Sequence, residues 1–476
     1  MKRGKKLLTL LLVLVVLAGL TVLIPRLLPD EDAGSDDADN SFSILTLDAD
    51  DITGISWDYS EALTFLRSGD SWVYADDSAF PLDESYLETM LSTLTQVTAT
   101  KAIEEPEDLD QYGLEVPLCT VTVTAGESYT LSLGSETSLG GERYLSTGDG
   151  KVYLVDSTIL DSFSYGLFDL LEYESIPNLY DTTGFHVESN SQSYDLVKLE
   201  NSGIAYSDSY VWFLENGGSY LTLDTDLTEA LIDNISTMTW GQCVTYNVSG
   251  DALAQYGLDD PTATITVNYS QTSEVETNET DEDGNPITET QETPATFVLE
   301  IGSEGTDGCY ARIAGSNMVY LIDSAIRDDL CYTTYNDLRP DEVLLLDTTA
   351  ISGLDILLNG ETYHITRTDT EVTDEEGNIS SETVFLLGET EVTVSGLLST
   401  ITGLDSTGYA DTIPDATPEI SFILYRDHET YPELSLAFYP YDSSSCLTVL
   451  GGNPTVFTAR EDILSLIEDV NAIIGE

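Results

Sequence analysis

The sequence predicts an α+β protein, with an N-terminal transmembrane helix followed by three repeated modules of mostly antiparallel sheet with packed helices. Two observations lead to this fold class. Near its start the chain has an uncharged stretch of 18 residues, Leu7–Ile24, and the rest of the 476 residues repeats one order of expected elements three times. Because the expected strands are joined by short connections without crossover helices, we expect antiparallel pairing.

The uncharged stretch is long enough for a membrane anchor. As a helix, Leu7–Ile24 would span about 27 Å, close to the thickness of the hydrocarbon core of a bilayer. It is longer than the core of about 7–15 residues found in signal peptides, although a cleaved signal peptide is the alternative. Basic residues precede it, so the positive-inside rule leaves the N-terminus in the cytoplasm. We therefore expect a single-pass protein of the cell membrane, with the bulk of the chain extracytoplasmic.

Three segments show the repeat most clearly. They are "VYLVDSTILDSF" (Val152–Phe163), "VYLIDSAIRDDL" (Val319–Leu330) and "VFTAREDILSLI" (Val456–Ile467). Each predicts a strand that passes directly into a helix, and glycine-containing turns upstream predict β-hairpins. In the first two segments, Asp156 and Asp323 stand where an N-cap side chain accepts a hydrogen bond from the first helical turn.

An amphipathic helix is expected earlier in each module, from apolar residues at helical spacing. The expected apolar faces are Leu87, Met90, Leu91, Leu94 and Val97; Leu227, Leu231, Ile235 and Met238; and Val394, Leu397, Leu398, Ile401 and Leu404. The resulting organisation is a basic start and anchor at 1–28, an acidic tether at 29–50, and modules at 51–180, 181–346 and 347–476, the last of them divergent.

Two polar insertions should form exposed hairpins or mobile loops. They are Thr280–Thr290 and Thr373–Thr383, each with Gly-Asn at the expected turn. The first has only a weak likeness to a calcium-binding loop, because Thr290 stands where that loop needs a bidentate glutamate.

The tetrapeptide Gln-Tyr-Gly-Leu occurs twice, at 111–114 and 255–258, and a proline follows each copy. We expect Gly113 and Gly257 to end short helical turns with positive φ, which glycine adopts at little cost. In such a helix stop, Leu109 should contact Leu114, and Leu253 should contact Leu258. A duplicated ligand site is the alternative interpretation.

The charge of the chain limits its partners. Five of the 16 Lys and Arg residues lie in the first 26 positions, so the following 450 residues carry 11 basic against 86 acidic groups. Such a surface repels phosphate backbones, and we expect no nucleic-acid partner. Adaptation to high salt would produce a similar composition.

The residues that usually carry chemistry form no recognisable constellation in the sequence. The histidines (His186, His364, His428), the cysteines (Cys119, Cys243, Cys309, Cys331, Cys446) and the tryptophans (Trp57, Trp72, Trp212, Trp240) are scattered. We expect the cysteines to be mostly buried, although one bridge is possible, and the tryptophans to favour the core over sugar stacking. We therefore assign no catalytic, cofactor-binding or metal-binding residue, expect no cofactor, and leave any ligand-binding residues unknown.

The assembled motifs resemble the domain-of-unknown-function 4340 family of bacterial membrane-associated proteins. The motifs are "GDSWVYAD" (Gly69–Asp76), "YGLEVP" and "YGLDDP", the "LSLGS" and "LEIGS" strands, and the "VYLVD" and "VYLID" strands. The resemblance implies a single-pass protein with an extracytoplasmic α+β repeat region. Members are often encoded beside ABC-type export systems and gliding-motility-like components, and the family brings no established catalytic residues.

From these observations we expect a non-enzymatic, membrane-anchored interaction protein. It would bind the membrane through Leu7–Ile24 and protein partners in an envelope complex, as an accessory component of an ABC-type export or gliding-motility-like system. The alternative is a cell-envelope carbohydrate-binding protein or a glycoside hydrolase, since 86 carboxylates make a chance pair at catalytic spacing hard to exclude.

Overall fold

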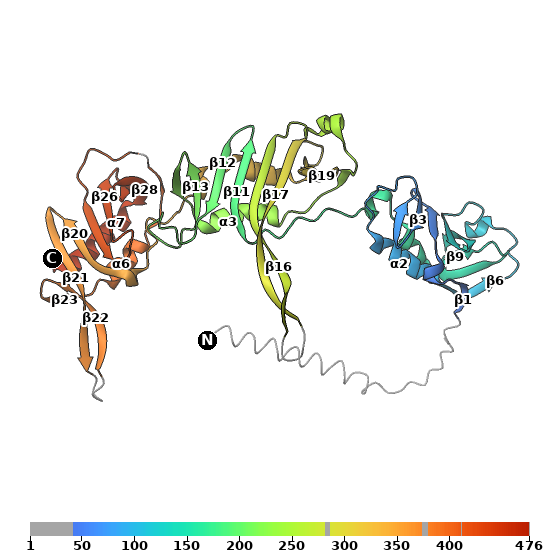
Figure 1. Cartoon of the computed structure of the whole chain (residues 1–476), viewed down its shortest axis with the longest axis horizontal. Coiled ribbons are helices and arrows are strands. Elements are labelled where there is room, and N and C mark those ends of the chain that lie inside the picture. The colour runs from blue at the N-terminus through green and yellow to red at the C-terminus, as the bar shows by residue number, and fades with distance from the viewer. Residues whose placement is uncertain (1–40, 281–285, 374–378, 411, 476) are drawn as a thin grey trace. The chain divides into compact units, whose positions relative to one another are not determined.

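The computed structural model describes residues 41–280, 286–373, 379–410 and 412–475 (Figure 1). The chain divides into two compact units, residues 1–172 and residues 173–476. Each of the three expected modules contains one large sheet, and a small two-stranded sheet joins β1 (Phe42–Thr46) to β5 (Gln96–Ala99). The strand β1 falls within residues 29–50, which the sequence assigns to a tether.

The predicted fold class is wrong and is corrected here. Strands hold 44% of the chain that the structure describes and helices 21%, so antiparallel sheet dominates. The expected transmembrane helix at Leu7–Ile24 lies outside the described residues. Within them, no helix is long and apolar enough to cross a membrane. The 15 residues of α7 (Arg460–Ile474) fall short of the roughly 20 that a crossing requires.

The first sheet has eight strands in the order β4-β3-β2-β7-β8-β9-β10-β6. Its strands are β2 (Gly54–Asp58), β3 (Ala62–Ser68), β4 (Ser71–Tyr74), β6 (Lys101–Ile103), β7 (Cys119–Ala125), β8 (Glu127–Glu136), β9 (Glu142–Ser146) and β10 (Val152–Asp156). Its helices are α2 (Glu84–Thr95) and the 3-10 helices η1 (Ala49–Asp51), η2 (Asp110–Tyr112), η3 (Ser157–Phe163) and η4 (Leu167–Leu170).

The second sheet has nine strands in the order β14-β13-β12-β11-β16-β17-β18-β19-β15. Its strands are β11 (Thr182–Ser189), β12 (Ser193–Lys198), β13 (Trp212–Asn216), β14 (Ser219–Thr222), β15 (Cys243–Thr245), β16 (Ala263–Thr280), β17 (Pro286–Glu304), β18 (Cys309–Ile313) and β19 (Val319–Ile322). Its helices are α3 (Thr225–Ser236), η5 (Gly250–Tyr256), α4 (Ser324–Tyr332) and α5 (Tyr335–Leu338).

The third sheet also has nine strands, in the order β23-β22-β21-β20-β25-β26-β27-β28-β24. Its strands are β20 (Ile351–Leu358), β21 (Glu361–Thr373), β22 (Ile379–Leu387), β23 (Thr390–Val392), β24 (Gly408–Tyr409), β25 (Ile420–Arg426), β26 (Glu433–Pro440), β27 (Ser445–Leu450) and β28 (Asn453–Ala459). Its helices are η6 (Thr348–Ala350), α6 (Ser395–Thr402) and α7.

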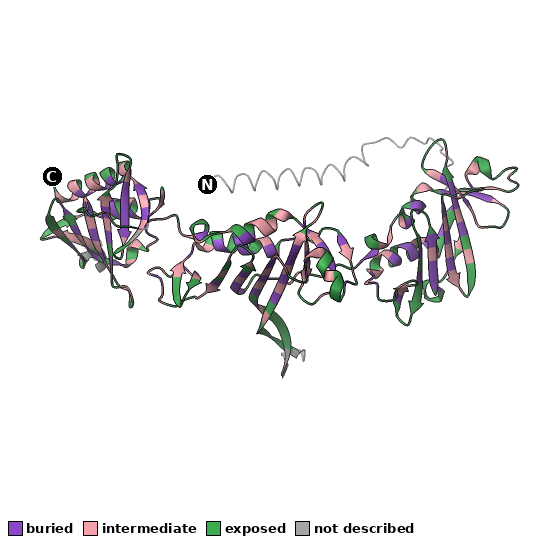
Figure 2. Cartoon of the chain, turned by 90° about the horizontal axis from the view of Figure 1, so that it is seen from above, coloured by how far each residue is buried: buried purple, intermediate pink, exposed green. Residues whose placement is uncertain are grey.

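The three sheets share one connectivity, which confirms the repeated sheet modules. In each, the first strand of the large sheet pairs both with the strand that follows it and with a later strand of the module, and the last hairpin passes into a helix. One strand face is buried against the helices, as the alternation in Figure 2 shows. In the third module, for example, α6 and α7 pack into the same core as β20 and β25. The modules are therefore two-layered, with helices on one face of each sheet.

The helix starts follow the expected capping. Asp156 accepts a hydrogen bond from the Thr158 amide at 2.9 Å, and Asp323 accepts one from the Ala325 amide at 2.9 Å. In the third module the equivalent N-cap is Ala459, which has no side chain able to cap. The divergence noticed in the sequence thus removes one interaction and leaves the helix in place.

The expected face of α3 needs one correction. Leu227 is 41% exposed, whereas Thr228 is fully buried and donates its hydroxyl hydrogen to the Asp224 carbonyl at 2.6 Å. Helix α3 begins at Thr225, so the buried stripe runs through Thr228, Leu231, Ile232 and Ile235. A short polar residue can face the core here because the backbone carbonyl of the N-cap satisfies it.

Candidate functional site

The two Gln-Tyr-Gly-Leu copies are helix stops, as the sequence predicts. Gly113 and Gly257 have φ of 65° and 66°. The amide of Leu114 donates to the Leu109 carbonyl at 3.0 Å, and the amide of Leu258 donates to the Leu253 carbonyl at 3.1 Å. These are the six-residue hydrogen bonds of a Schellman motif, although the helices that they end are 3-10 rather than α.

The expected hydrophobic contact is clear in the second copy only. Leu253 packs in one cluster with Leu258, whereas Leu109 is 41% exposed. Ser249 is the N-cap of η5, but its side chain makes no capping hydrogen bond. The first copy is therefore held mainly by its backbone.

Each helix stop docks on a glycine-serine pair in the neighbouring strand, which sequence reasoning missed. A Cβ added to Gly134 would lie 2.2 Å from the Tyr112 carbonyl oxygen, and one added to Gly302 would lie 2.1 Å from the Tyr256 carbonyl oxygen. The pairing register shifts between Leu133 and Glu136 and again between Ile301 and Glu304. A β-bulge thus brings each strand glycine against the turn. The signal was present as the repeated "LSLGS" and "LEIGS".

The tyrosines of the motif pack on the sheet. Tyr112 meets Tyr144 edge to face with ring centroids 4.9 Å apart, and Tyr256 meets Tyr310 in the same way at 5.1 Å. In the third module Tyr409 instead lies under the Arg339 guanidinium at 3.8 Å. The tyrosine, glycine and leucine of each copy therefore have structural partners, which favours the helix-stop interpretation over a ligand site.

The tryptophans are mainly core residues. Trp57, Trp72 and Trp212 are buried, and Trp240 is half-buried and stacks on Tyr320 with ring centroids 4.3 Å apart. A basic side chain lies over two of them, since Arg67 and Lys198 each stand 6.0 Å from the ring centroid of Trp72 and Trp212. The described tryptophans thus offer no open aromatic platform of the kind that binds sugars.

Two histidines form cross-strand pairs with aspartates. His186 Nδ1 lies 2.6 Å from Asp195 Oδ1, and His364 Nδ1 lies 2.6 Å from Asp355 Oδ1. His428 Nδ1 instead accepts hydrogen bonds from two amides of its own turn, those of Thr430 and Tyr431. Among the described residues, no group of three or more His, Cys, Asp or Glu is placed to hold a metal ion.

All five cysteines are buried free thiols, so the bridge left open in the sequence does not form. Burial raises the pKa of the Cys119 thiol to about 12 and that of Cys243 to about 11. At neutral pH these groups are protonated and behave as small apolar residues.

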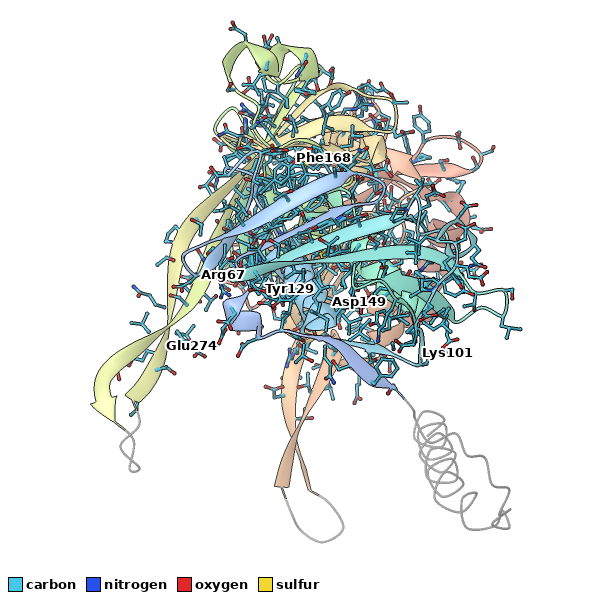
Figure 3. All side chains as sticks on the ribbon, turned by 90° about the vertical axis from the view of Figure 1, so that its right-hand side faces the viewer. Arg67, Lys101, Tyr129, Asp149, Phe168 and Glu274 are labelled. Carbon is cyan, nitrogen blue, oxygen red and sulfur yellow. The ribbon has the colours of Figure 1, made fainter. Side chains whose placement is uncertain are left out.

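Two long hairpin arms leave the sheets (Figure 1). Strands β16 and β17 remain paired from Ala263–Ile301 in the sheet out to Thr280–Pro286. Glu274 lies on this arm, away from the body of its sheet (Figure 3). The arm of the third module, β21 with β22, is shorter, and its pairing ends at Thr373–Ile379. The sequence prediction of exposed hairpins is correct for the described parts, and both tips lie outside them.

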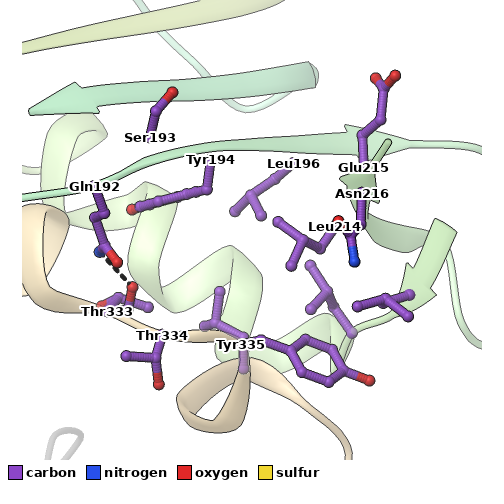
Figure 4. Close-up of a pocket in the computed structure, with 13 residues that line it drawn as sticks. Gln192, Ser193, Tyr194, Leu196, Leu214, Glu215, Asn216, Thr333, Thr334 and Tyr335 are labelled. Carbon is purple, nitrogen blue, oxygen red and sulfur yellow. Dashed lines mark hydrogen bonds between the residues drawn. The ribbon is translucent and has the colours of Figure 1, made fainter. Parts of the chain in front are cut away.

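A cavity of about 450 Å³ opens beside the outermost strands of the second sheet (Figure 4). Its apolar lining comes from β12, β13, β14 and α5, and its polar lining from the same strands and the segment before α5. The lining residues are Gln192, Ser193, Tyr194, Leu196, Leu214, Glu215, Asn216, Leu221, Leu223, Thr333, Thr334, Tyr335 and Leu338. The volume falls in the range of about 300–1,000 Å³ that is usual for small binding sites.

Hydrogen bonds hold the wall of this cavity in place. The Gln192 amide donates to the Thr333 carbonyl at 2.7 Å and to the Cys331 carbonyl at 2.9 Å. The Tyr194 hydroxyl donates to the Leu330 carbonyl at 2.7 Å, and burial raises its pKa. Glu215 is the one carboxylate of the lining, so the paired carboxylates that a glycosidase needs are not assembled in this cavity.

A second cavity, of about 460 Å³, lies beside the outermost strands of the third sheet, between β22, β23 and α6. Modules two and three therefore each have a cavity at the same edge. Neither cavity was foreseen from the sequence. The first depends on how β12, β13 and β14 meet the distant segment Thr333–Leu338, and the second on how β22, β23 and α6 pack against one another.

The chain is thus a multi-module sheet protein with three repeated antiparallel-sheet modules, two of which have an exposed arm and an edge cavity. The sequence pattern of the family described as "Domain of unknown function (DUF4340)" matches residues 72–205 and 212–420. The chain belongs to this family. No curated protein and no solved structure matches it.

The strand glycines give a stability prediction. Gly302→Ala should lower the free energy of unfolding by at least about 2 kcal/mol, because the new methyl group overlaps the Tyr256 carbonyl. Gly184→Ala in β11 of the same module is the matched control, since its Cβ would meet nothing closer than 3.5 Å. Urea unfolding of both variants measures the difference. Equal stabilities would show that the turn is not held by close backbone approach.

The cysteines give a pH prediction. At about pH 8 the native thiols of Cys119, Cys243, Cys331 and Cys446 should react with iodoacetamide at least about 100-fold more slowly than after unfolding in urea, because burial raises their pKa and keeps them protonated. Unfolded thiols ionise near 8.5, so the stability contributed by buried neutral thiols is present below that pH and is lost as the pH rises toward the folded values. Mass spectrometry counts the adducts. A Thr290→Cys variant, exposed on the arm, should react at once.

Proposed function

We propose that the chain is a non-enzymatic interaction protein, held at the membrane by Leu7–Ile24 with its modules outside the cytoplasm. Its role would be that of an accessory component in an ABC-type export or gliding-motility-like envelope complex. The observation that carries this proposal is the arm formed by β16 and β17.

The arm adds little to its own module. Beyond Ser270–Pro294 its strands pair only with each other, as at Glu274–Thr290. The described side chains of Gln271–Val275 and Ile287–Pro294 are exposed. An isolated two-stranded ribbon is marginally stable in water, so the arm gains no stability from a core. A binding role explains why such a segment would be kept.

The chemistry of the arm suits a protein surface. Thr and Glu face each other across it, as in Thr272–Glu292 and Glu274–Thr290, and no Lys or Arg lies between Gln271 and Thr293. Val275 and Ile287 add apolar area, with exposed fractions of 44% and 39%. An acidic ribbon with a few apolar side chains favours a basic protein partner through charge complementarity.

Removing the arm tests the proposal. Residues 272–292 are replaced by Asn-Gly, which joins the paired Gln271 and Thr293 by a two-residue turn. The thermal unfolding temperature should change little, because none of the described side chains in the deleted segment is buried. Crosslinking in membranes of the source organism should then lose the partners that the unaltered chain captures.

An arm with fewer negative charges serves as the matched control. The triple variant Glu274→Gln, Glu289→Gln and Glu292→Gln keeps the hairpin and removes three charges, so it should capture partners less well and with weaker salt dependence. If the shortened chain captures the same proteins as the unaltered chain, the arm is not the binding element and the proposal fails.

The membrane association gives a separate prediction. Deleting Lys2–Ile24 should release the chain from the membrane fraction as a soluble, folded protein, because the modules carry a strong acidic charge. Sedimentation of membranes followed by circular dichroism of the supernatant checks this. Continued sedimentation with the membranes, or aggregation, would contradict the tether.

A further inference from the structure

The outermost strand of the second sheet, β14, has a free edge. A two-residue turn, Gly217–Gly218, with φ of 59° and 88°, joins β13 to β14, as in a type I′ hairpin. The Leu223 amide donates to the Trp212 carbonyl at 3.0 Å. Because hydrogen bonding alternates along an antiparallel strand, Tyr220 and Thr222 must point their N–H and C=O groups away from β13. In the described part of the chain, no strand pairs with that side.

The first module closes the corresponding edge. The two sheets can be aligned by a cross-strand pair of a basic residue with a tryptophan. Arg67 pairs with Trp72 of β4, and Lys198 pairs with Trp212 of β13, so β4 corresponds to β13. The first sheet has no counterpart of β14. Its outermost strand is β4, and the Trp72 amide donates to the Glu84 carboxylate at 3.2 Å. The extra edge strand of the second module therefore exposes backbone N–H and C=O groups. At the edge of the first module, the outward amide of Trp72 is instead hydrogen-bonded within the module.

The cavity of Figure 4 lies beside this edge on the face to which Leu221 points. Leu214 and Asn216 share that face across the hairpin, because they pair with Leu221 and Ser219. The Asn216 side chain is turned toward the cavity (Figure 4). A strand added to β14 would direct alternate side chains to the same face, so one or two of them would enter the cavity.

The charge around the edge selects among extended segments. From Trp212 to Asp233 the chain holds five carboxylates and no Lys or Arg. The remaining side chains of an added strand would point away from the cavity, to the sheet face on which Glu215 lies, because Glu215 pairs with Tyr220 rather than with Leu221. Lysine or arginine at those alternate positions would be attracted, and aspartate or glutamate would be repelled.

We propose that β14 and its cavity bind an extended segment of a partner protein by strand addition, with apolar side chains in the cavity and basic side chains alternating with them. This inference rests on the proposed interaction function and names the chemistry of one partner segment. It concerns an edge separate from the arm of β16 and β17.

The probe is a fluorescein-labelled peptide of about seven residues in which lysine alternates with leucine or valine, a length typical of one strand. Its anisotropy with the full-length chain should rise and saturate. The same peptide with a central proline, or with glutamate in place of lysine, should bind at least about 10-fold more weakly. Two results would overturn the proposal. One is no binding at about 1 mM probe, because the Kd would then be weaker than that of ordinary weak complexes. The other is equal binding of all three peptides.

Two variants locate the binding. Thr222→Pro removes an outward N–H that no other residue uses and should weaken probe binding about 5- to 10-fold, whereas Thr222→Val keeps the N–H and should bind normally. Leu221→Trp should fill the cavity and weaken binding at least about 10-fold, with Leu221→Met as its control. Thermal unfolding confirms that each variant folds. Unchanged affinity in both Thr222→Pro and Leu221→Trp would overturn the assignment.

The remaining outcomes separate this inference from the proposed function. If crosslinking through the arm persists while the probe fails to bind, strand addition at β14 is wrong and the interaction function stands. If light scattering shows that the chain self-associates and Thr222→Pro abolishes this, the edge binds a second copy and the assignment to a partner segment is overturned.

Discussion

In the first two modules the fold depends on one close approach of backbone to backbone. At Gly134 and Gly302 the strand passes so near a turn carbonyl that no side chain fits between them. The β-bulge at each glycine makes room for the turn, and the positive φ of Gly113 and Gly257 turns the chain back toward the sheet. The tyrosine of each turn then packs on a tyrosine of the sheet, and the chain enters the next strand. The absence of a Cβ at these two positions thus lets each turn lie directly against its strand.

Much of this arrangement can be predicted from the sequence because it is local. Helix stops, N-caps at Asp156 and Asp323, and hairpins depend on residues a few positions apart, and these predictions are confirmed. The predicted fold class failed where a local pattern was extended to the whole chain, since sheet dominates and no described helix can cross a membrane. Leu227 was misplaced because the spacing of apolar residues does not reveal where a helix begins. The cavity of the second module could not be foreseen, because its walls come from strands and a helix more than one hundred residues apart, such as Gln192 and Thr333.

The few basic residues of the modules have specific structural partners. Arg312 pairs with Glu300 and Arg460 with Glu419, each at 2.6 Å, while Arg67 and Lys198 lie over tryptophan rings. These positively charged side chains therefore contact carboxylates or tryptophan rings of the sheets. The surface left for partners is acidic, and differences between modules, rather than their shared motifs, distinguish one binding surface from another.

The two histidine–aspartate pairs have a consequence for how the repeats assemble. His186 of β11 faces Asp195 of β12, but in the third module the positions are exchanged, with Asp355 on β20 and His364 on β21. If β20 took the place of β11 beside β12, two aspartates would face each other, and the reverse exchange would oppose two histidines. Misassembly between similar repeats is a common failure in folding of such chains. The exchanged order of histidine and aspartate distinguishes correct from incorrect strand pairing while the newly made chain folds.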